Sequence, residues 1–297
     1  MALMVCAPVA EARHRHAHPH AVPNYISTQD LAIPVNAALR AQADGKRVIV
    51  VFDIDNTLLT TPQDLGGDTW YNWKRTGLSA DAYRDLITNN TALLQLAKLR
   101  PTQPDTAALI AELQARHITV YALSARGTNL RGATEDVLKV NGIDFSGAPE
   151  CGPPLCVKRG NLGDTEIRSA ARQIGLPVPD KAFRSLTISD GLIMATGQNK
   201  GLVLNLLLHS LPGKGYTDVY FVDDTFSNIT DMQQAAPQIQ ARVHPYSYER
   251  FWTDSNAFMH DKARQDKADA DYDNLRHSLC AAIQAAVCDT PSLTVKP

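Results

Sequence analysis

Two aspartates follow directly on an apolar run at residues 48–52. The run VIVVF leads into Asp53 and Asp55, two positions apart, where a buried strand is expected to end. The chain must turn beyond the strand, so a carboxylate and a backbone carbonyl can face one site. Two unneutralised carboxylates this close raise each other's pKa. A hard divalent cation such as Mg²⁺ relieves that repulsion and prefers oxygen ligands, so the stretch predicts a metal-dependent site.

Three further polar signals stand at the ends of expected elements. Ser124 ends the apolar strand 118–124, and Lys200 opens a helix after GQN. Asp223 and Asp224 end the strand VYFVDD. Open parallel sheets bind their ligands at the carboxyl ends of the strands. We therefore expect these groups to converge with Asp53 and Asp55 at one edge of the sheet.

The four signals in this order resemble the motifs of the haloacid dehalogenase (HAD) superfamily of aspartate-nucleophile phosphotransferases. FDIDNTLL matches the D-x-D-x-T motif, and Ser124, Lys200 and Asp223 follow in the order that the superfamily shows. The resemblance spans about residues 46–245. Within the superfamily the chain is most similar to an uncharacterised bacterial subgroup, and it is distantly similar to exported acid phosphatases. The insertion at residues 144–186 departs from both patterns.

The resemblance implies a role for each matched residue. Asp53 would be the nucleophile and become an aspartyl-phosphate, and Asp55 would act as general acid and then general base. The second aspartate indicates a phosphatase rather than a dehalogenase. Mg²⁺ is the implied cofactor, with ligands from Asp53, Asp55, Asp223 and Asp224. The implied phosphate-binding residues are Thr57, Ser124, Lys200 and, as a secondary candidate, Arg126.

Two of the neighbouring residues allow a second interpretation. Arg126 follows Ser124 in SARG and is equally compatible with a surface position at a helix entry. Asn228 lies five residues after Asp223 and can contact the coordination sphere of the metal, but capping of the next helix is the favoured interpretation.

The pattern of elements that must position these residues predicts an α/β fold. Strand, insertion, helix and strand alternate as in a Rossmann-like parallel sheet flanked by helices, with helical or irregular cap insertions. We expect residues 23–297 to form one catalytic domain with insertions at about 61–103 and 144–186. The elements expected around it include a helix capped near Ser27, a helix after Ser79, a hairpin turning at Asp190-Gly191, and helical residues 257–287.

The insertion after the nucleophile contains LGGDTWYNW, residues 65–73. Gly66 and Gly67 permit a sharp bend. Trp70, Tyr71 and Trp73 form either a lid over the substrate or the packing surface between cap and core.

The N-terminal residues indicate export. MALMVCAPVAEA is apolar with small residues and contains an A-x-A pattern, so residues 1–22 are interpreted as a signal-peptide remnant and a His-rich tail. The expected location is periplasmic or secreted. The alternating histidines from His14 to His20 are either a solvated tail or a metal-binding tract.

Four cysteines follow this leader. Either they form disulfides, as suits an exported protein, or they are free buried thiols; their connectivity is left open. They are Cys151, Cys156, Cys280 and Cys288.

The overall composition excludes two partner classes. A net charge of -2 offers no general attraction to nucleic acid or to an anionic membrane, and no segment reaches the roughly 18 apolar residues of a membrane span. We expect a small phosphorylated substrate or a phosphopeptide, and the oligomeric state is left open. The alternatives to a phosphatase are a phosphotransferase of the same fold and an exported metal-binding protein with a relic site.

Overall fold

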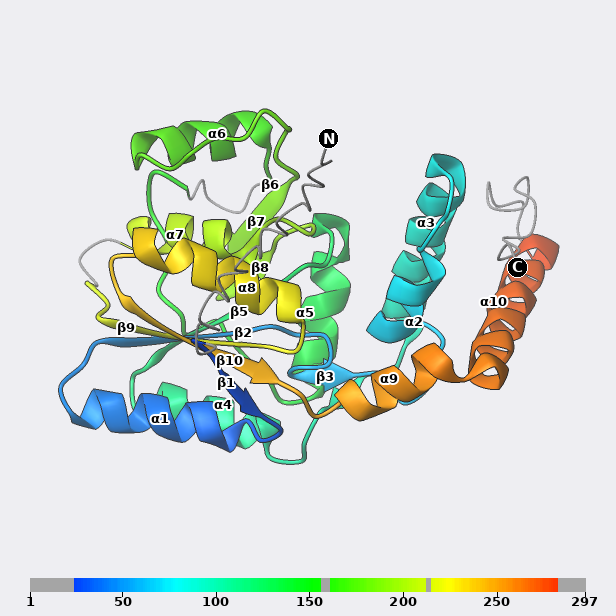
Figure 1. The fold of residues 1–297 in the computed structure, drawn as a ribbon, viewed down its shortest axis with the longest axis horizontal. Helices are drawn as coiled ribbons and strands as arrows, with labels where there is room; N and C mark the ends of the chain where they lie inside the picture. The colour runs from blue at the N-terminus through cyan, green and yellow to red at the C-terminus, as the bar shows by residue number, and fades with distance from the viewer. Residues whose placement is uncertain (1–23, 156–160, 212–214, 283–297) are drawn as a thin grey trace, which may run out of the picture.

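A mixed eight-stranded sheet forms the centre of the computed structural model, which describes residues 24–155, 161–211 and 215–282 (Figure 1). Its order is β1-β10-β9-β2-β5-β8-β7-β6. All neighbours are parallel except β7, which is antiparallel to both β8 and β6. The strands of this sheet are β1 (Ile26–Thr28), β2 (Val48–Phe52), β5 (Thr119–Ser124), β6 (Asn161–Leu162), β7 (Leu186–Ser189), β8 (Leu192–Met194), β9 (Asp218–Asp223) and β10 (Arg242–Tyr248). The predicted Rossmann-like α/β fold is confirmed.

A two-stranded ribbon and the helices surround this sheet. The ribbon pairs β3 (Leu59–Thr60) with β4 (Arg100–Pro101). The α-helices of the described residues are α1 (Ala32–Ala43), α2 (Asp68–Lys74), α3 (Ala80–Leu96), α4 (Thr106–Ala115), α5 (Arg131–Val140), α6 (Asp164–Gln173), α7 (Lys200–His209), α8 (Phe226–Ala235), α9 (Trp252–His260) and α10 (Lys262–Ala282). Short 3₁₀ turns, η1 (Thr128–Leu130) and η2 (Ala236–Gln238), precede α5 and follow α8. Among the described helices none is long and apolar enough to cross a membrane.

The strand β2 lies at the centre of the sheet and is buried on both faces. Val48, Val50 and Phe52 belong to an apolar cluster that includes residues of α1, α4 and α5, whereas Ile49 and Val51 belong to a second cluster with residues of α6, α7 and α8. A continuous apolar run is what a parallel strand covered by helices on both sides requires. The two layers therefore hold the carboxyl end of β2, and with it Asp53, in a fixed position.

Two segments far apart in sequence form a separate helical cap. In Figure 1, α2 and α3 lie beside α9 and α10, away from the sheet. Trp70, Leu86, Phe258, Ala268 and Tyr272 form the buried apolar centre of this cap. The side chain of Lys74 is also buried and pairs with Asp269 of α10 at 2.8 Å. The C-terminal helices thus complete a unit that begins directly after the nucleophile turn.

Three local predictions can be compared with the observed elements. Ser79 does cap α3, since its Oγ accepts the Ala82 N–H. The helix predicted from Ser27 is wrong at its start, because pairing with β10 makes Ile26–Thr28 an edge strand and α1 begins at Ala32. The helical stretch 257–287 is interrupted at Asp261. The Asp261 carboxylate accepts the N–H groups of Ala263 and Arg264 and so starts a new helix.

Several predictions fall on residues outside the described ones. The signal-peptide remnant and the histidine tract lie in residues 1–23, and Cys156 and Cys288 lie in residues 156–160 and 283–297. Cys151 and Cys280 are both disulfide-bonded. Export therefore stays a prediction, and the connectivity of the disulfides stays open.

Candidate active site

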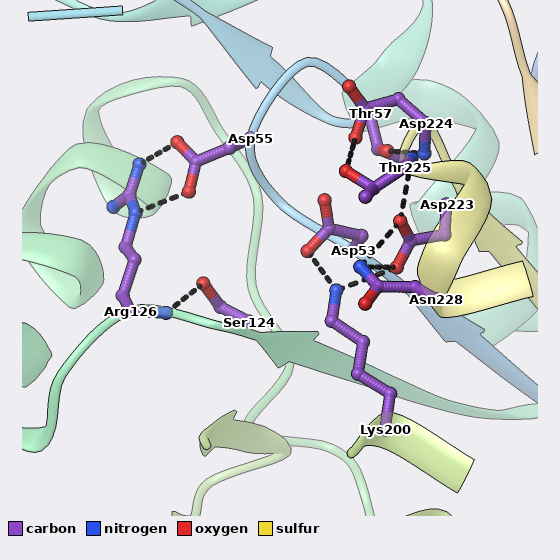
Figure 2. Close-up of polar contacts among 10 residues, drawn as sticks. All are labelled: Asp53, Asp55, Thr57, Ser124, Arg126, Lys200, Asp223, Asp224, Thr225 and Asn228. Carbon is purple, nitrogen blue, oxygen red and sulfur yellow. Dashed lines mark hydrogen bonds and ion pairs between the residues drawn. The ribbon is translucent and has the colours of Figure 1, made fainter. Parts of the chain in front are cut away.

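The carboxyl ends of β2 and β9 bring two buried carboxylates to one lysine. Asp53 continues the pairing of β2, because its N–H donates to Val222 O of β9 at 2.8 Å. The Lys200 ammonium lies between the two strands and donates to Asp53 Oδ1 at 2.5 Å and to Asp223 Oδ2 at 2.6 Å (Figure 2). All three side chains are almost fully buried. The predicted convergence of these residues is observed.

The electrostatics of this group favour a bound cation. Burial raises the pKa of Asp53 to about 8, and the neighbouring carboxylates add to the rise while Lys200 opposes it. Burial acts to lower the pKa of Lys200, but Asp223 and Asp53 outweigh it, so the ammonium stays charged. One lysine therefore leaves the buried negative charge incompletely compensated, and a divalent ion is the usual remedy.

Lys200 reaches this position because two helices cross closely behind it. Asn199 caps α7 by accepting the Leu202 N–H at 2.9 Å. The next residue after the lysine is Gly201, where a Cβ would lie 2.6 Å from both Ala235 Cβ and Asp231 O of α8. A glycine at this crossing lets the start of α7 approach the end of β9.

A loop after β9 supplies a second acidic group. Carboxylate oxygens of Asp53, Asp223 and Asp224 lie within 4.8 Å of one another, as a metal site needs. Burial raises the pKa of Asp224 well above its usual range, and Asp53 and other acids add to the rise. Three oxygen ligands of this kind fit Mg²⁺, which usually keeps several waters as well. The residues present therefore fit the implied metal.

Side chains and backbone around Asp223 fix its carboxylate. Asn228 Nδ2 donates to Asp223 Oδ1 at 2.9 Å and to Oδ2 at 3.1 Å, and the Thr225 N–H donates to Oδ1 at 2.9 Å. The favoured interpretation of Asn228 as a helix cap is wrong, because α8 has Thr225 at its N-cap. Asn228 instead binds a candidate metal ligand.

Thr57 joins the turn after β2 to the loop after β9. Its Oγ1 accepts the Asp224 N–H at 3.1 Å, and its carbonyl accepts from Thr102 Oγ1 at 2.6 Å. Asn56, directly before it, has a φ of 55°, as the sharp turn of the chain away from β2 requires. Thr57 is fully buried and thus keeps the nucleophile turn in register with the metal loop.

Asp55 lies apart from the lysine cluster and faces Arg126. Arg126 donates from Nε and Nη2 to the two Asp55 oxygens at 2.9 and 2.8 Å, and from Nη1 to Thr134 at 3.0 Å. Burial acts to lower the pKa of Arg126, but Asp55 outweighs it and raises this pKa. The surface interpretation of Arg126 is therefore wrong. Ser124 is buried beside this pair, where its Oγ accepts the Arg126 N–H at 3.1 Å.

The aromatic residues of the insertion are part of the cap. Trp70 packs against Tyr272 of α10 with ring centroids 5.3 Å apart, and Trp73 meets Phe258 edge-on at 5.7 Å. Trp70 is fully buried, so packing within the cap accounts for it. Tyr71 is only half-buried and hydrogen-bonds Tyr83 of α3.

One acidic residue near the site was not singled out from the sequence. Asp68 opens α2 and is half-buried. Burial and the Asp55 carboxylate raise the pKa of Asp68 to about 6, and Lys200 and Asp223 also act on it. The sequence feature that could have identified Asp68 is its position directly after Gly66 and Gly67 in the insertion.

Comparison with protein families gives one assignment. A family model described as protein of unknown function, DUF2608, matches residues 28–284. No curated protein matches the chain.

Several solved structures are similar at low identity. The HAD domain of effector protein Lem4 from Legionella pneumophila is 14% identical, covering 75% of this chain and 98% of its own, with a TM-score of 0.34. A HAD family hydrolase from Deinococcus radiodurans R1 with bound phosphate and sodium is 15% identical over 66% and 79%, with a TM-score of 0.31. Class C acid phosphatase from Bacillus anthracis with tungstate bound is 17% identical over 80% and 86%, with a TM-score of 0.32. Likenesses at this level transfer no activity to this chain.

Proposed function

The chain belongs to the DUF2608 family, and we propose that it is a Mg²⁺-dependent phosphomonoesterase that works through an aspartyl-phosphate on Asp53. The observation that carries the proposal is the buried group of Lys200, Asp53 and Asp223, with Asp224 beside it. A lysine held between two carboxylates at adjacent strand ends is costly to bury. Perturbed charges gathered at the ligand-binding edge of a parallel sheet are typical of catalytic sites.

The first step forms a covalent intermediate. An Asp53 carboxylate oxygen attacks phosphorus, and the bond from phosphorus to the ester oxygen breaks. Protonated Asp55 gives its proton to the leaving oxygen, so an alcohol departs and Asp55 becomes a carboxylate. The observed bidentate pairing with Arg126 fixes the orientation of the Asp55 side chain.

The second step returns the enzyme to its starting state. Asp55 takes a proton from water as the water oxygen attacks the phosphorus of the intermediate. The bond to Asp53 then breaks, which frees inorganic phosphate and the Asp53 carboxylate. Throughout both steps Lys200 and the Ser124 hydroxyl stabilise negative charge on the phosphoryl oxygens. A bound Mg²⁺ would be held by Asp53, Asp223 and Asp224 and would supply further electrostatic stabilisation of that charge.

The nucleophile is tested by Asp53→Asn. The amide cannot form the acyl-phosphate, so hydrolysis of a chromogenic phosphomonoester with Mg²⁺ should fall by about 10³-fold or more. Hydroxylamine added during turnover should trap the aspartyl-phosphate of the unaltered chain. No such intermediate should be trapped with the variant. The matched control is Asp81→Asn, since the Asp81 side chain is 79% exposed on α3. Full activity of Asp53→Asn, or activity unaffected by a chelator, would refute the proposal.

A further inference from the structure

Arg126 is held at both ends of its side chain. At the backbone, its N–H donates to Ser124 Oγ at 3.1 Å, and its carbonyl accepts the Thr196 N–H at 2.9 Å. At the tip, its guanidinium donates from Nη1 to Thr134 Oγ1 at 3.0 Å. A free arginine side chain has many rotamers, so a contact at each end confines the guanidinium to one position.

Thr134 uses its hydroxyl differently from three other helical threonines. Thr88, Thr91 and Thr230 each donate theirs to the carbonyl four residues earlier, as threonines in helices commonly do. The Thr134 hydroxyl instead accepts from Arg126, and the residue is fully buried in α5. The start of α5 therefore presents a buried acceptor to a charged group that comes from the loop after β5.

Another edge of the same guanidinium holds Asp55 (Figure 2). Nε and Nη2 of Arg126 bind the two carboxylate oxygens at 2.9 and 2.8 Å. The Arg126 side chain is 5% exposed and that of Asp55 is 30% exposed, so the carboxylate keeps a side open to a substrate. A planar bidentate pair fixes the rotation of the carboxyl group as well as its distance. It uses two of about four lone-pair positions, which leaves a position for the proton that the mechanism moves.

We propose that Thr134 is a positioning residue for the general acid. It holds Arg126, and through Arg126 the Asp55 carboxyl group, in the orientation that delivers a proton to the ester oxygen. In that step the Asp55 O–H bond breaks, an O–H bond forms on the departing oxygen, and the electrons of the bond to phosphorus go to that oxygen. Proton transfer needs the donor within hydrogen-bond reach, so a rotated Asp55 should slow it. This inference rests on the proposed function, because it adds a residue to the proton transfer of the same site.

Two esters with leaving groups of different acidity test the proposal on the full chain with Mg²⁺. 4-Nitrophenyl phosphate releases a stable anion that needs little proton transfer, whereas benzyl phosphate releases an alcohol that needs a complete one. Thr134→Val keeps the branched shape of the side chain and removes the acceptor. We expect kcat/KM to fall about tenfold for benzyl phosphate, as for one lost hydrogen bond to a charged group. For 4-nitrophenyl phosphate the fall should be less than about twofold.

Two further variants separate positioning from general damage to the fold. Thr134→Ser retains the hydroxyl and should restore the hydrolysis of benzyl phosphate. Thr187→Val removes a comparable bond between α5 and β7, because Arg131 Nη1 donates to Thr187 Oγ1 at 3.0 Å. That variant should leave the ratio of the two kcat/KM values unchanged, whatever it does to Tm.

A double variant tests whether the effect passes through Asp55. Asp55→Asn should show the same dependence on the leaving group with a loss of about 10²-fold or more, and adding Thr134→Val to it should cause no further loss. The inference is overturned, and the proposed function stands, if Thr134→Val lowers both kcat/KM values equally or lowers neither. A loss that adds in full to that of Asp55→Asn overturns it as well. If the unaltered chain hydrolyses neither ester, the proposed function itself fails, and the positioning role fails with it.

Discussion

The sheet and the cap hold their residues in place by different means. In the sheet, two apolar clusters cover both faces of β2 and its neighbours, and the reactive residues follow directly on buried strands. In the cap, five buried apolar residues are supplemented by polar links between distant segments. Lys74 binds Asp269, Arg264 binds Asp64, and Thr69 binds Ser255. The sheet is therefore secured by burial, and the cap depends on specific pairs.

Among the changes that test this contrast, Lys74→Met is expected to have the largest effect on stability. The Lys74 side chain is 2% exposed, and Asp269 would remain as a partly buried, uncompensated carboxylate. Because breaking a buried pair is costly, we expect a loss of about 2 to 3 kcal/mol in the cap. Hydrogen exchange should speed up in α2 and α10, while amides of β2 and β9 keep their protection.

The control for this change is Lys262→Met, since Lys262 pairs with Asp266 on the surface and is 80% exposed. Such a pair contributes at most a few tenths of a kcal/mol. If Lys74→Met instead increased exchange across the whole sheet, cap and sheet would unfold as one unit and the contrast would be wrong.

The matching change in the sheet layer is Gly201→Ala. The added methyl would overlap Ala235 and a backbone oxygen of α8, and such overpacking costs about 1 to 3 kcal/mol. Since the neighbouring residue is Lys200, the same shift should lower kcat for phosphomonoester hydrolysis. The expected loss of stability is global. The Tm of the protein should fall, and amides of the sheet and of the cap should lose protection alike.

Gly132→Ala is the paired control for that substitution. Gly132 lies near the start of α5, and an added Cβ meets nothing within 4 Å. Alanine there should raise stability by about 0.5 to 1 kcal/mol, because glycine is a poor helix former. A Gly201→Ala protein as stable and active as the parent would show that the crossing of α7 and α8 tolerates a larger distance.

The same contrast explains which features could be predicted from the sequence. Asp53, Ser124 and Asp223 each follow a run of apolar residues, and the topology of parallel sheets brings such strand ends together. Local pattern and global fold therefore agree at these positions. The pairing of β1 with β10 was not predictable, because three residues carry almost no periodicity and their strand state comes from a partner more than 200 residues away.

The part that the C-terminal helices play in the cap was beyond prediction for a related reason. Nothing in GGDTWYNW indicates that its tryptophans pack on Phe258 and Tyr272, which lie near the end of the chain. Asn228 was misinterpreted because hydrogen-bonding side chains near a helix start usually cap it. In this fold its amide reaches Asp223 instead.

The smallest expected effect concerns the junction between sheet and cap, at Trp252. This residue opens α9, and its indole Nε1 donates to the Asp224 carbonyl at 2.8 Å. The C-terminal helices are thereby attached to a loop that supplies a candidate metal ligand. Trp252→Phe removes the donor and keeps an aromatic ring, so one hydrogen bond worth about 1 kcal/mol is lost.

We expect this loss to appear in metal binding rather than in folding. Calorimetric titration with Mg²⁺ should show an affinity about fivefold weaker in Trp252→Phe, with a nearly unchanged Tm in the absence of metal. Trp73→Phe is the control, because Trp73 contacts Phe258 inside the cap and should change cap stability without changing Mg²⁺ affinity. If both variants bind Mg²⁺ like the parent, the metal loop is positioned by the sheet alone. The cap would then take no part in building the site.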